Sequence, residues 1–157
     1  MIENCNILKE DEFDPQKYQQ GLIKILIAQD KGSHHFRIEN KSGHYLLKLR
    51  LIERQNNRMC DYLILNCSEK KAFFVELKGQ NLSDAVMQIQ STLKTLSPRL
   101  SAFKFFARIV QTRVIRSTNQ LDKESLIKYL KEKHKSNIEG KITDLVKIGS
   151  EKLIETI

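Results

Sequence analysis

The eight-residue segment KAFFVELK, residues 71–78, constrains the fold of this chain more than any other segment. Side chains alternate between the two faces of a strand, and apolar residues occupy both faces of this one. A strand of this kind is typical of the centre of a sheet that is covered on both sides. We therefore expect residues 71–78 to form an inner strand, with other elements packed above and below it.

Two charged residues, Glu76 and Lys78, interrupt the apolar pattern near the end of this strand. Alternation places Glu76 and Lys78 on one face, within an otherwise apolar run, and burying such charges is costly unless they are paired. Asp61 lies in the preceding apolar segment, MCDYLIL, and the polar stretch CSEKK separates the two segments. If the two strands pair through that turn, Asp61 and Glu76 converge at one end of the sheet with Lys78 nearby.

Two carboxylates at one sheet end suit a divalent metal. Mg²⁺ accepts carboxylate oxygens and keeps several waters. A bound metal lowers the pKa of a water and neutralises charge on a scissile phosphate. A nearby lysine can orient or deprotonate that water, or stabilise the transition state.

The spacing Glu-x-Lys is weak evidence by itself, because it occurs four times: at Glu39/Lys41, Glu69/Lys71, Glu76/Lys78 and Glu139/Lys141. Only Glu76/Lys78 ends a long apolar strand. The alternative interpretation is a buried ion pair that serves the structure alone. We favour the catalytic interpretation, because perturbed ionisable clusters concentrate at functional sites.

The rest of the sequence predicts an α/β or α+β domain around a mixed sheet. The first half contributes a helix from Pro15 to about Lys31, capped by Asp14. It also contributes two strands, HFRIEN and HYLLKLRLIE, which form a hairpin around residues 40–43. RMCDYLILNC is the strand before residues 71–78.

The second half predicts a helix after Gly79, with Asn81 or Ser83 as its cap and Pro98 as its end. FKFFARIVQTRVI predicts a further strand, and residues 122–135 a charged helix. Residues 141–157 close the domain either as a strand pair or as a strand followed by a helix.

Length and composition favour a single soluble domain over residues 1–157. The chain has 157 residues, of which 40% are hydrophobic, and no apolar run reaches the roughly 20 residues that a membrane span needs. The acidic N-terminus lacks the pattern of a secretory signal, so we expect a cytoplasmic protein. Three cysteines without a CxxC pair do not predict disulfides, and we expect Cys60 and Cys67 to be core thiols.

Charge points to a polyanionic partner. The formal net charge is +8, and residues 99–157 hold 13 of the 27 basic residues but only 7 of the 19 acidic ones. A one-sided positive field favours nucleic acid, although a solvated basic face is an equally simple explanation. The proposed phosphate contacts come from a stretch without acidic residues: Arg99, Lys104, Arg108, Arg113 and Arg116.

Asp61, then Glu76-Leu77-Lys78 at a strand end, then Gly79 and a helix with Gln88 resemble the PD-(D/E)xK nuclease superfamily. That family's restriction-endonuclease-like core is a helix, three strands, a second helix and a further strand. The resemblance places this core at about residues 15–111, with residues 112–157 as a basic C-terminal extension. In this chain, Cys60 stands where the name-giving proline would be.

The resemblance implies hydrolysis of phosphodiester bonds by metal-activated water. It makes Asp61, Glu76 and the Leu77 carbonyl ligands of Mg²⁺, which Mn²⁺ can replace, and places Lys78 beside the attacking water. Gln88 matches a glutamine of some branches, although an ordinary helix-flank role explains it equally well. Many members add an acidic residue on the first helix. Residues 15–29 have none, so Glu39 or Glu53 is the candidate substitute.

We therefore expect a magnesium-dependent endonuclease that acts on DNA rather than RNA. Cutting both strands needs two active sites, so a homodimer is consistent with this function. The alternative is an inactive module of the same fold that binds nucleic acid or a protein partner.

Overall fold

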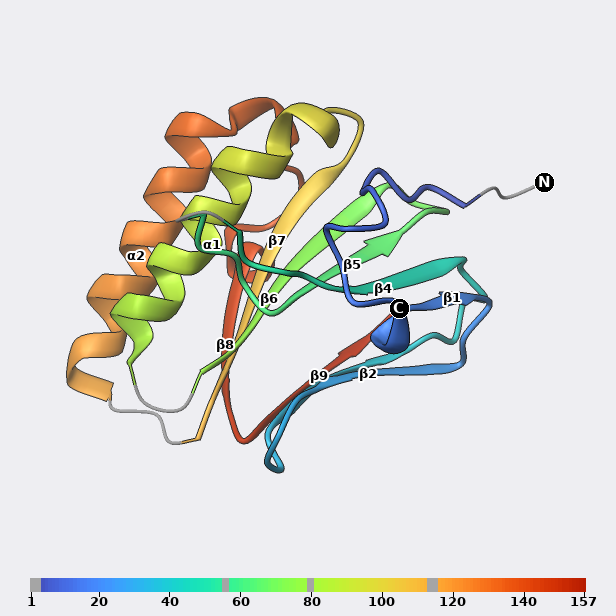
Figure 1. Cartoon of the computed structure of the whole chain (residues 1–157). Helices are drawn as coiled ribbons and strands as arrows, with labels where there is room; N and C mark the ends of the chain where they lie inside the picture. The colour runs from blue at the N-terminus through green and yellow to red at the C-terminus, as the bar shows by residue number, and fades with distance from the viewer. Residues whose placement is uncertain (1–3, 55–56, 79–80, 113–115) are drawn as a thin grey trace.

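The computed structural model describes residues 4–54, 57–78, 81–112 and 116–157, with only the backbone for residues 78 and 116–119. It contains two sheets and two long helices (Figure 1). The larger sheet has the order β1-β4-β5-β6-β7-β8, formed by Gln19–Gly21, Leu46–Arg50, Tyr62–Asn66, Lys71–Lys78, Lys104–Gln111 and Val146–Ser150. The smaller sheet has the order β2-β3-β9, formed by Ile25–Gln29, His35–Glu39 and Lys152–Thr156.

The helices and the two sheets form three layers. Helices α1 (Leu82–Leu96) and α2 (Arg116–Lys133) cover one face of the six-stranded sheet (Figure 1). The three-stranded sheet covers the other face, where its Phe36 and Ile38 meet Phe73 and Val75 of β6. Short helical segments complete the described chain: Pro15–Lys17 (η1), Ser97–Arg99 (η2), Lys135–Asn137 (η3) and Ile142–Leu145 (α3).

The structure confirms the mixed α/β class and the central place of residues 71–78. Strand β6 pairs antiparallel with β5 and parallel with β7, and residues 72–77 are all buried. Helix α1 connects these two parallel strands. Its Asn81 side chain accepts a hydrogen bond from the Asp84 N–H, which is the predicted cap.

The helix predicted over residues 15–31 is wrong. Asp14 and Pro15 start only the short turn η1, and the chain then forms β1 and β2. In β2, Leu26 and Ala28 are buried while Ile25 and Ile27 are exposed, which is the period of a strand. The spacing of Tyr18, Leu22, Ile25 and Leu26 fits a helical stripe, but the β-branched isoleucines of this segment favour the strand.

The predicted hairpin of residues 35–53 is also wrong, although both of its strands exist. Strand β3 pairs with β2 and β9 in the smaller sheet, whereas β4 pairs with β1 and β5 in the larger one. The residues between β3 and β4 therefore carry the chain from one sheet to the other.

The C-terminal extension is part of both sheets. Strand β8 pairs parallel with β7, and β9 pairs parallel with β3. The corner between them is tight: Glu151 has a φ of 65°, and a Cβ at Gly149 would lie 2.6 Å from the Lys152 carbonyl oxygen. The structure thus confirms two strands within residues 141–157, but β8 and β9 join different sheets instead of pairing with each other.

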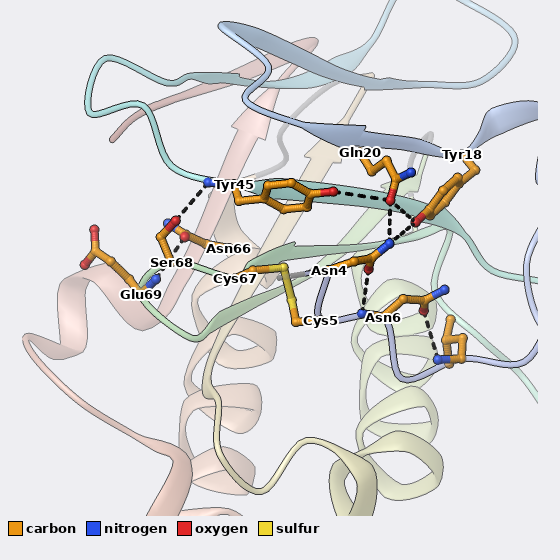
Figure 2. The surroundings of a disulfide bond; sticks show 11 residues. Asn4, Cys5, Asn6, Tyr18, Gln20, Tyr45, Asn66, Cys67, Ser68 and Glu69 are labelled. Carbon is orange, nitrogen blue, oxygen red and sulfur yellow. Dashed lines mark hydrogen bonds between the residues drawn. A yellow bond between two sulfur atoms is a disulfide. The ribbon is translucent and has the colours of Figure 1, made fainter. Parts of the chain in front are cut away.

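Cys5 and Cys67 form a disulfide that ties the N-terminal segment to the residue after β5 (Figure 2). Around it, the Asn4 amide donates to the Tyr18 hydroxyl, and the Tyr18 and Tyr45 hydroxyls both donate to Gln20. The expectation of a free thiol is therefore wrong for Cys67 and correct for the buried Cys60. The cytoplasmic location stays a prediction, and the disulfide does not support it, because disulfides are rare in cytosolic proteins.

Within the described residues, no helix has both the length and the apolar character that crossing a membrane requires.

Candidate functional site

Asp61 and Glu76 lie opposite each other where β5 begins and β6 approaches its end. Tyr62 pairs with Val75, and the next pair outward brings Asp61 beside Glu76. The Asp61 N–H donates to Glu76 Oε1 at 3.1 Å, and the Leu77 N–H donates to Asp61 Oδ2 at 2.7 Å. Each carboxylate is therefore fixed by the backbone beside the other. The convergence inferred from the sequence is confirmed for these two residues.

The two carboxylates differ in their exposure. Glu76 is 1% exposed, while the Asp61 side chain is 19% exposed. Burial raises the pKa of Asp61 above its ordinary value, although the hydrogen bond from Leu77 and the charge of Arg50 lower it. A carboxylate whose charged form is disfavoured by burial gains from a cation placed next to it.

Arg50, the last residue of β4, supplies one positive charge to this pair. Its Nη2 lies 3.3 Å from Asp61 Oδ1 and 3.0 Å from Asp30 Oδ2. Asp30 follows β2, so this contact joins the smaller sheet to the site. The Tyr62 hydroxyl also lies 2.9 Å from Asp30 Oδ1.

The first turns of α1 border the site on the helical side. Arg58 Nη2 lies 2.5 Å from Asp84 Oδ1, and the charge of Arg58 also interacts with those of Glu53 and Glu76. Gln88, one turn further along α1, is buried, with its Nε2 3.5 Å from Asp84 Oδ2. Gln88 is thus linked to the site through Asp84, which pairs with Arg58.

A second link runs from α1 to the residue before Asp61. The Thr92 hydroxyl donates to the Gln88 carbonyl at 2.8 Å and accepts from the Cys60 N–H at 2.7 Å. Burial raises the pKa of the Cys60 thiol, so this residue has the properties of an inert core thiol. Helix α1 therefore fixes the backbone of Cys60, and with it the start of β5.

The donor set fits a small divalent cation. No group of three or more His, Cys, Asp or Glu side chains suited to a metal occurs among the described residues. Two carboxylates are nevertheless enough for Mg²⁺, which usually completes its shell with water. The oxygens that accept backbone hydrogen bonds each keep a second lone pair.

The remaining predicted site residues are placed only in part. Lys78 is the last residue of β6, and its side chain lies outside the described part of the chain. Glu53 lies near the site, where its Oε1 accepts from the Met59 N–H at 3.3 Å. Glu39 does not lie near the site. It is the last residue of β3, whereas Asp30 lies near the other end of that strand, where His35 pairs with Gln29.

Among the described side chains of the predicted phosphate contacts, those of Arg99 and Lys104 lie away from the carboxylates. Arg99 follows the C-terminal end of α1, away from Asn81, and forms two hydrogen bonds to Glu12, at 2.8 and 2.9 Å. Lys104 starts β7 at the end opposite the one that pairs with Lys78, and donates to the Ser136 carbonyl. Arg113 and the side chain of Arg116 lie outside the described residues.

Arg108 cannot contact a phosphate as predicted, because its side chain is 2% exposed. Its guanidinium binds the Glu155 carboxylate through Nε and Nη2, at 3.1 and 2.9 Å, and lies over the rings of Phe73 and Phe106. The pair borders a cavity of about 700 Å³ at the other end of β6 from Glu76. The charges of Arg108 and Glu155 are therefore paired with each other inside the protein.

Sequence reasoning missed Asp30, Arg50, Asp84 and Arg58. One signal existed for Asp84, which occupies the first turn of the helix that directly follows Glu-x-Lys. Asp30 and Arg50 gave no such signal, because Asp30 was assigned to the end of a helix and Arg50 to a hairpin strand. Their meeting depends on the packing of the two sheets.

Comparison with known proteins gives no identity: no protein-family model, curated protein or solved structure matches this chain.

Proposed function

We propose that this protein is a magnesium-dependent nuclease that hydrolyses phosphodiester bonds in DNA. The observation that carries the proposal is the reciprocal bonding of Asp61 and Glu76 across β5 and β6, two residues before Lys78. Two fixed carboxylates at the end of an inner strand, with a lysine two residues further along that strand, are the parts that such chemistry needs.

In this proposal, Asp61, Glu76 and the Leu77 carbonyl hold the cation. When bound, Mg²⁺ lowers the pKa of a water and neutralises charge on the phosphate. Lys78 orients or deprotonates the attacking water, or stabilises charge in the transition state. Gln88 supports the site from α1 through Asp84. Mn²⁺ is expected to substitute for Mg²⁺.

The order of elements supports a restriction-endonuclease-like core, the fold of the PD-(D/E)xK superfamily. Strands β4, β5 and β6 form an antiparallel series, and α1 then leads to the parallel strand β7. This is the order three strands, helix, strand that the resemblance implies. The chain departs from it at the start, where β1 and β2 stand in place of a first helix.

DNA is the proposed substrate and a homodimer the proposed assembly. The net charge of +8 favours a polyanion. Cleavage of both strands of a duplex needs two sites, which a symmetric dimer supplies.

One observation favours a second candidate, an inactive binding module. In this structure both carboxylates already accept backbone hydrogen bonds, and Asp61 also pairs with Arg50. A purely structural network would look the same. It predicts that Asp61→Asn lowers the free energy of unfolding by about 3–5 kcal/mol, because Arg50 loses one of the two carboxylates that neutralise its charge.

The test is a cleavage assay with Mg²⁺ and Mn²⁺ on supercoiled plasmid, linear duplex, branched DNA and single-stranded RNA. Asp61→Ala and Lys78→Ala run beside the wild type, together with Arg54→Met as a matched control. Arg54 is exposed and pairs with the exposed Asp11.

We expect metal-dependent cutting of DNA that both site variants lose and the control keeps. Asp61→Asn should stay as stable as the wild type, because it relieves repulsion between the Asp61 and Glu76 carboxylates and so offsets the weaker contact with Arg50. Absence of cutting by the wild type on every substrate, together with retained nucleic-acid binding and an unstable Asp61→Asn variant, would select the binding module.

A further inference from the structure

We propose that Arg50 is a positioning residue for the Asp61 carboxylate, and that Asp30 in turn holds Arg50 in place. The inference rests on the proposed function, because it assigns the residues that orient a proposed metal ligand. It concerns three side chains from different parts of the fold: Asp30 after β2, Arg50 at the end of β4 and Asp61 before β5.

Every nitrogen of the Arg50 guanidinium has an acceptor. Nε donates to Asp30 Oδ1 at 3.1 Å, and Nη2 lies 3.0 Å from Asp30 Oδ2 and 3.3 Å from Asp61 Oδ1. Nη1 donates to the carbonyls of Leu51 and Asp61, at 3.1 and 2.9 Å. Nε and Nη1 therefore make hydrogen bonds, while Nη2 makes ion-pair contacts to both carboxylates.

The effect is to fix Asp61 at two points. Arg50 holds its backbone carbonyl through Nη1 and its Oδ1 through Nη2, while the Leu77 N–H holds Oδ2 from the other side. The Asp61 carbonyl also accepts from the Leu51 N–H at 2.9 Å, which closes the base of the loop that begins after β4 and ends at Asp61. These contacts restrict the orientation of the Asp61 carboxylate.

Asp30 determines where the guanidinium lies. Its two carboxylate oxygens receive Nε and Nη2 as a bidentate pair, a geometry that fixes the plane of the fork. The Tyr62 hydroxyl lies 2.9 Å from Asp30 Oδ1, and the Tyr62 ring lies under Arg50, 5.4 Å from its Cζ. The smaller sheet thus contributes to the site through Asp30.

This arrangement makes Arg50 a poor phosphate ligand and a good support. Its side chain is only 27% exposed, and all three of its nitrogens already contact oxygen atoms of the protein. A lysine at this position would keep the charge but not the planar fork, so it could not bind Asp30, the Leu51 carbonyl and both parts of Asp61 together. Arg50→Lys therefore keeps the positive charge at this position but removes the positioning contacts of the guanidinium.

The experiment measures Mn²⁺ binding by isothermal titration calorimetry for the wild type, Arg50→Lys, Asp30→Asn, the double variant and Lys17→Met. Lys17 is the matched control, because it pairs with Asp30 at 3.4 Å from an exposed position without touching Arg50. Circular dichroism and the Tm confirm that each variant is folded, and Asp30→Asn serves if Arg50→Lys does not fold.

We expect Arg50→Lys and Asp30→Asn each to weaken Mn²⁺ binding by about 10-fold or more, the size typical of residues that orient metal ligands. The double variant should lose no more than Arg50→Lys alone, since Asp30 acts through Arg50. Lys17→Met should bind as the wild type does. In the cleavage assay, kcat should fall in the two site variants while KM for DNA stays within about 2-fold of the wild type.

Unchanged Mn²⁺ affinity in folded Arg50→Lys and Asp30→Asn would overturn the positioning role and leave the nuclease proposal standing. The same holds for a rise in KM for DNA at constant metal affinity, which would make Arg50 a substrate contact. Absence of Mn²⁺ binding by the wild type would refute both proposals together.

Discussion

Arg99 and Glu12 form an ion pair that joins distant parts of the chain. Arg99 follows α1, and Glu12 belongs to the N-terminal segment. Hydrogen bonding to Arg99 lowers the pKa of Glu12 from 4.5 to about 2. The pair is partly exposed, so solvent weakens its contribution to stability.

The stability contributed by this pair should depend on pH. Between pH 4.5 and 2 the unfolded chain binds a proton at Glu12 and the folded chain does not, so stability rises with pH. The contribution is full above about pH 4.5 and lost as the pH falls toward 2. We expect urea denaturation to show a larger loss of stability for Arg99→Met at pH 7 than at pH 3.

Lys94→Met is the control, because it removes an exposed positive charge from the last turn of α1. A difference between wild type and Arg99→Met that stays constant with pH would contradict the assignment.

At the residue scale, the sequence was informative where apolar context surrounded a charge. Asp61 and Glu76 stood out because each interrupts an apolar strand, and the structure brings them together. Arg108 had the same context, in the run FKFFARIVQ, but was assigned to a surface by its charge. Its partner, Glu155, lies on β9, and no local pattern connects the two residues.

At the scale of elements, the β8–β9 corner shows how closely the two sheets approach. The chain leaves the larger sheet at Ser150 and enters the smaller one at Lys152, with Glu151 in the left-handed region. The Glu151 N–H bonds the Gln111 carbonyl, and the Glu151 carbonyl accepts from the His35 N–H. Both sheets are therefore joined at one residue.

Gly149→Ala should destabilise the fold by about 1–3 kcal/mol, because the new Cβ would lie 2.6 Å from the backbone oxygen of Lys152. Chemical denaturation measures this change. Ser150→Ala, a substitution at the exposed neighbouring position, should change stability by less than about 0.5 kcal/mol. Equal stability of the two variants would show that the corner tolerates a side chain.

Most strands and both long helices could be predicted from the sequence, but the way they pair could not. The alternation of residues 71–78 and the cap at Asn81 are local signals, and they identified β6 and α1. The pairing of β3 with β9 is set by packing between sheets, so adjacent strands such as β3 and β4 were mistaken for a hairpin. Short apolar runs such as ILIA satisfy a helical and a strand period alike.

At the scale of the whole molecule, the Cys5–Cys67 disulfide closes a loop with a sequence separation of 62 residues (Figure 2). A loop of this length restricts the unfolded chain by about 4 kcal/mol in the chain-entropy account. The bond also holds the N-terminal segment that carries Glu12.

Reduction of the disulfide should lower the free energy of unfolding by up to about 4 kcal/mol. Urea denaturation with and without dithiothreitol measures the effect. Cys5→Ser should resemble the reduced wild type and should not respond further to dithiothreitol. Equal stability of the oxidised and reduced wild type would show that the bond does not support the fold.

The pairing of the last strand with an early one also affects how the protein is made. Strand β3 lies between β2 and β9, so one of its edges stays open until β9 has been synthesised. An open edge is a site where other chains can add a strand. Contacts between distant parts of a sequence form slowly, because a long loop must close first. We therefore expect nascent chains to depend on chaperones until β9 joins the smaller sheet, and shortened chains that lack β9 to aggregate.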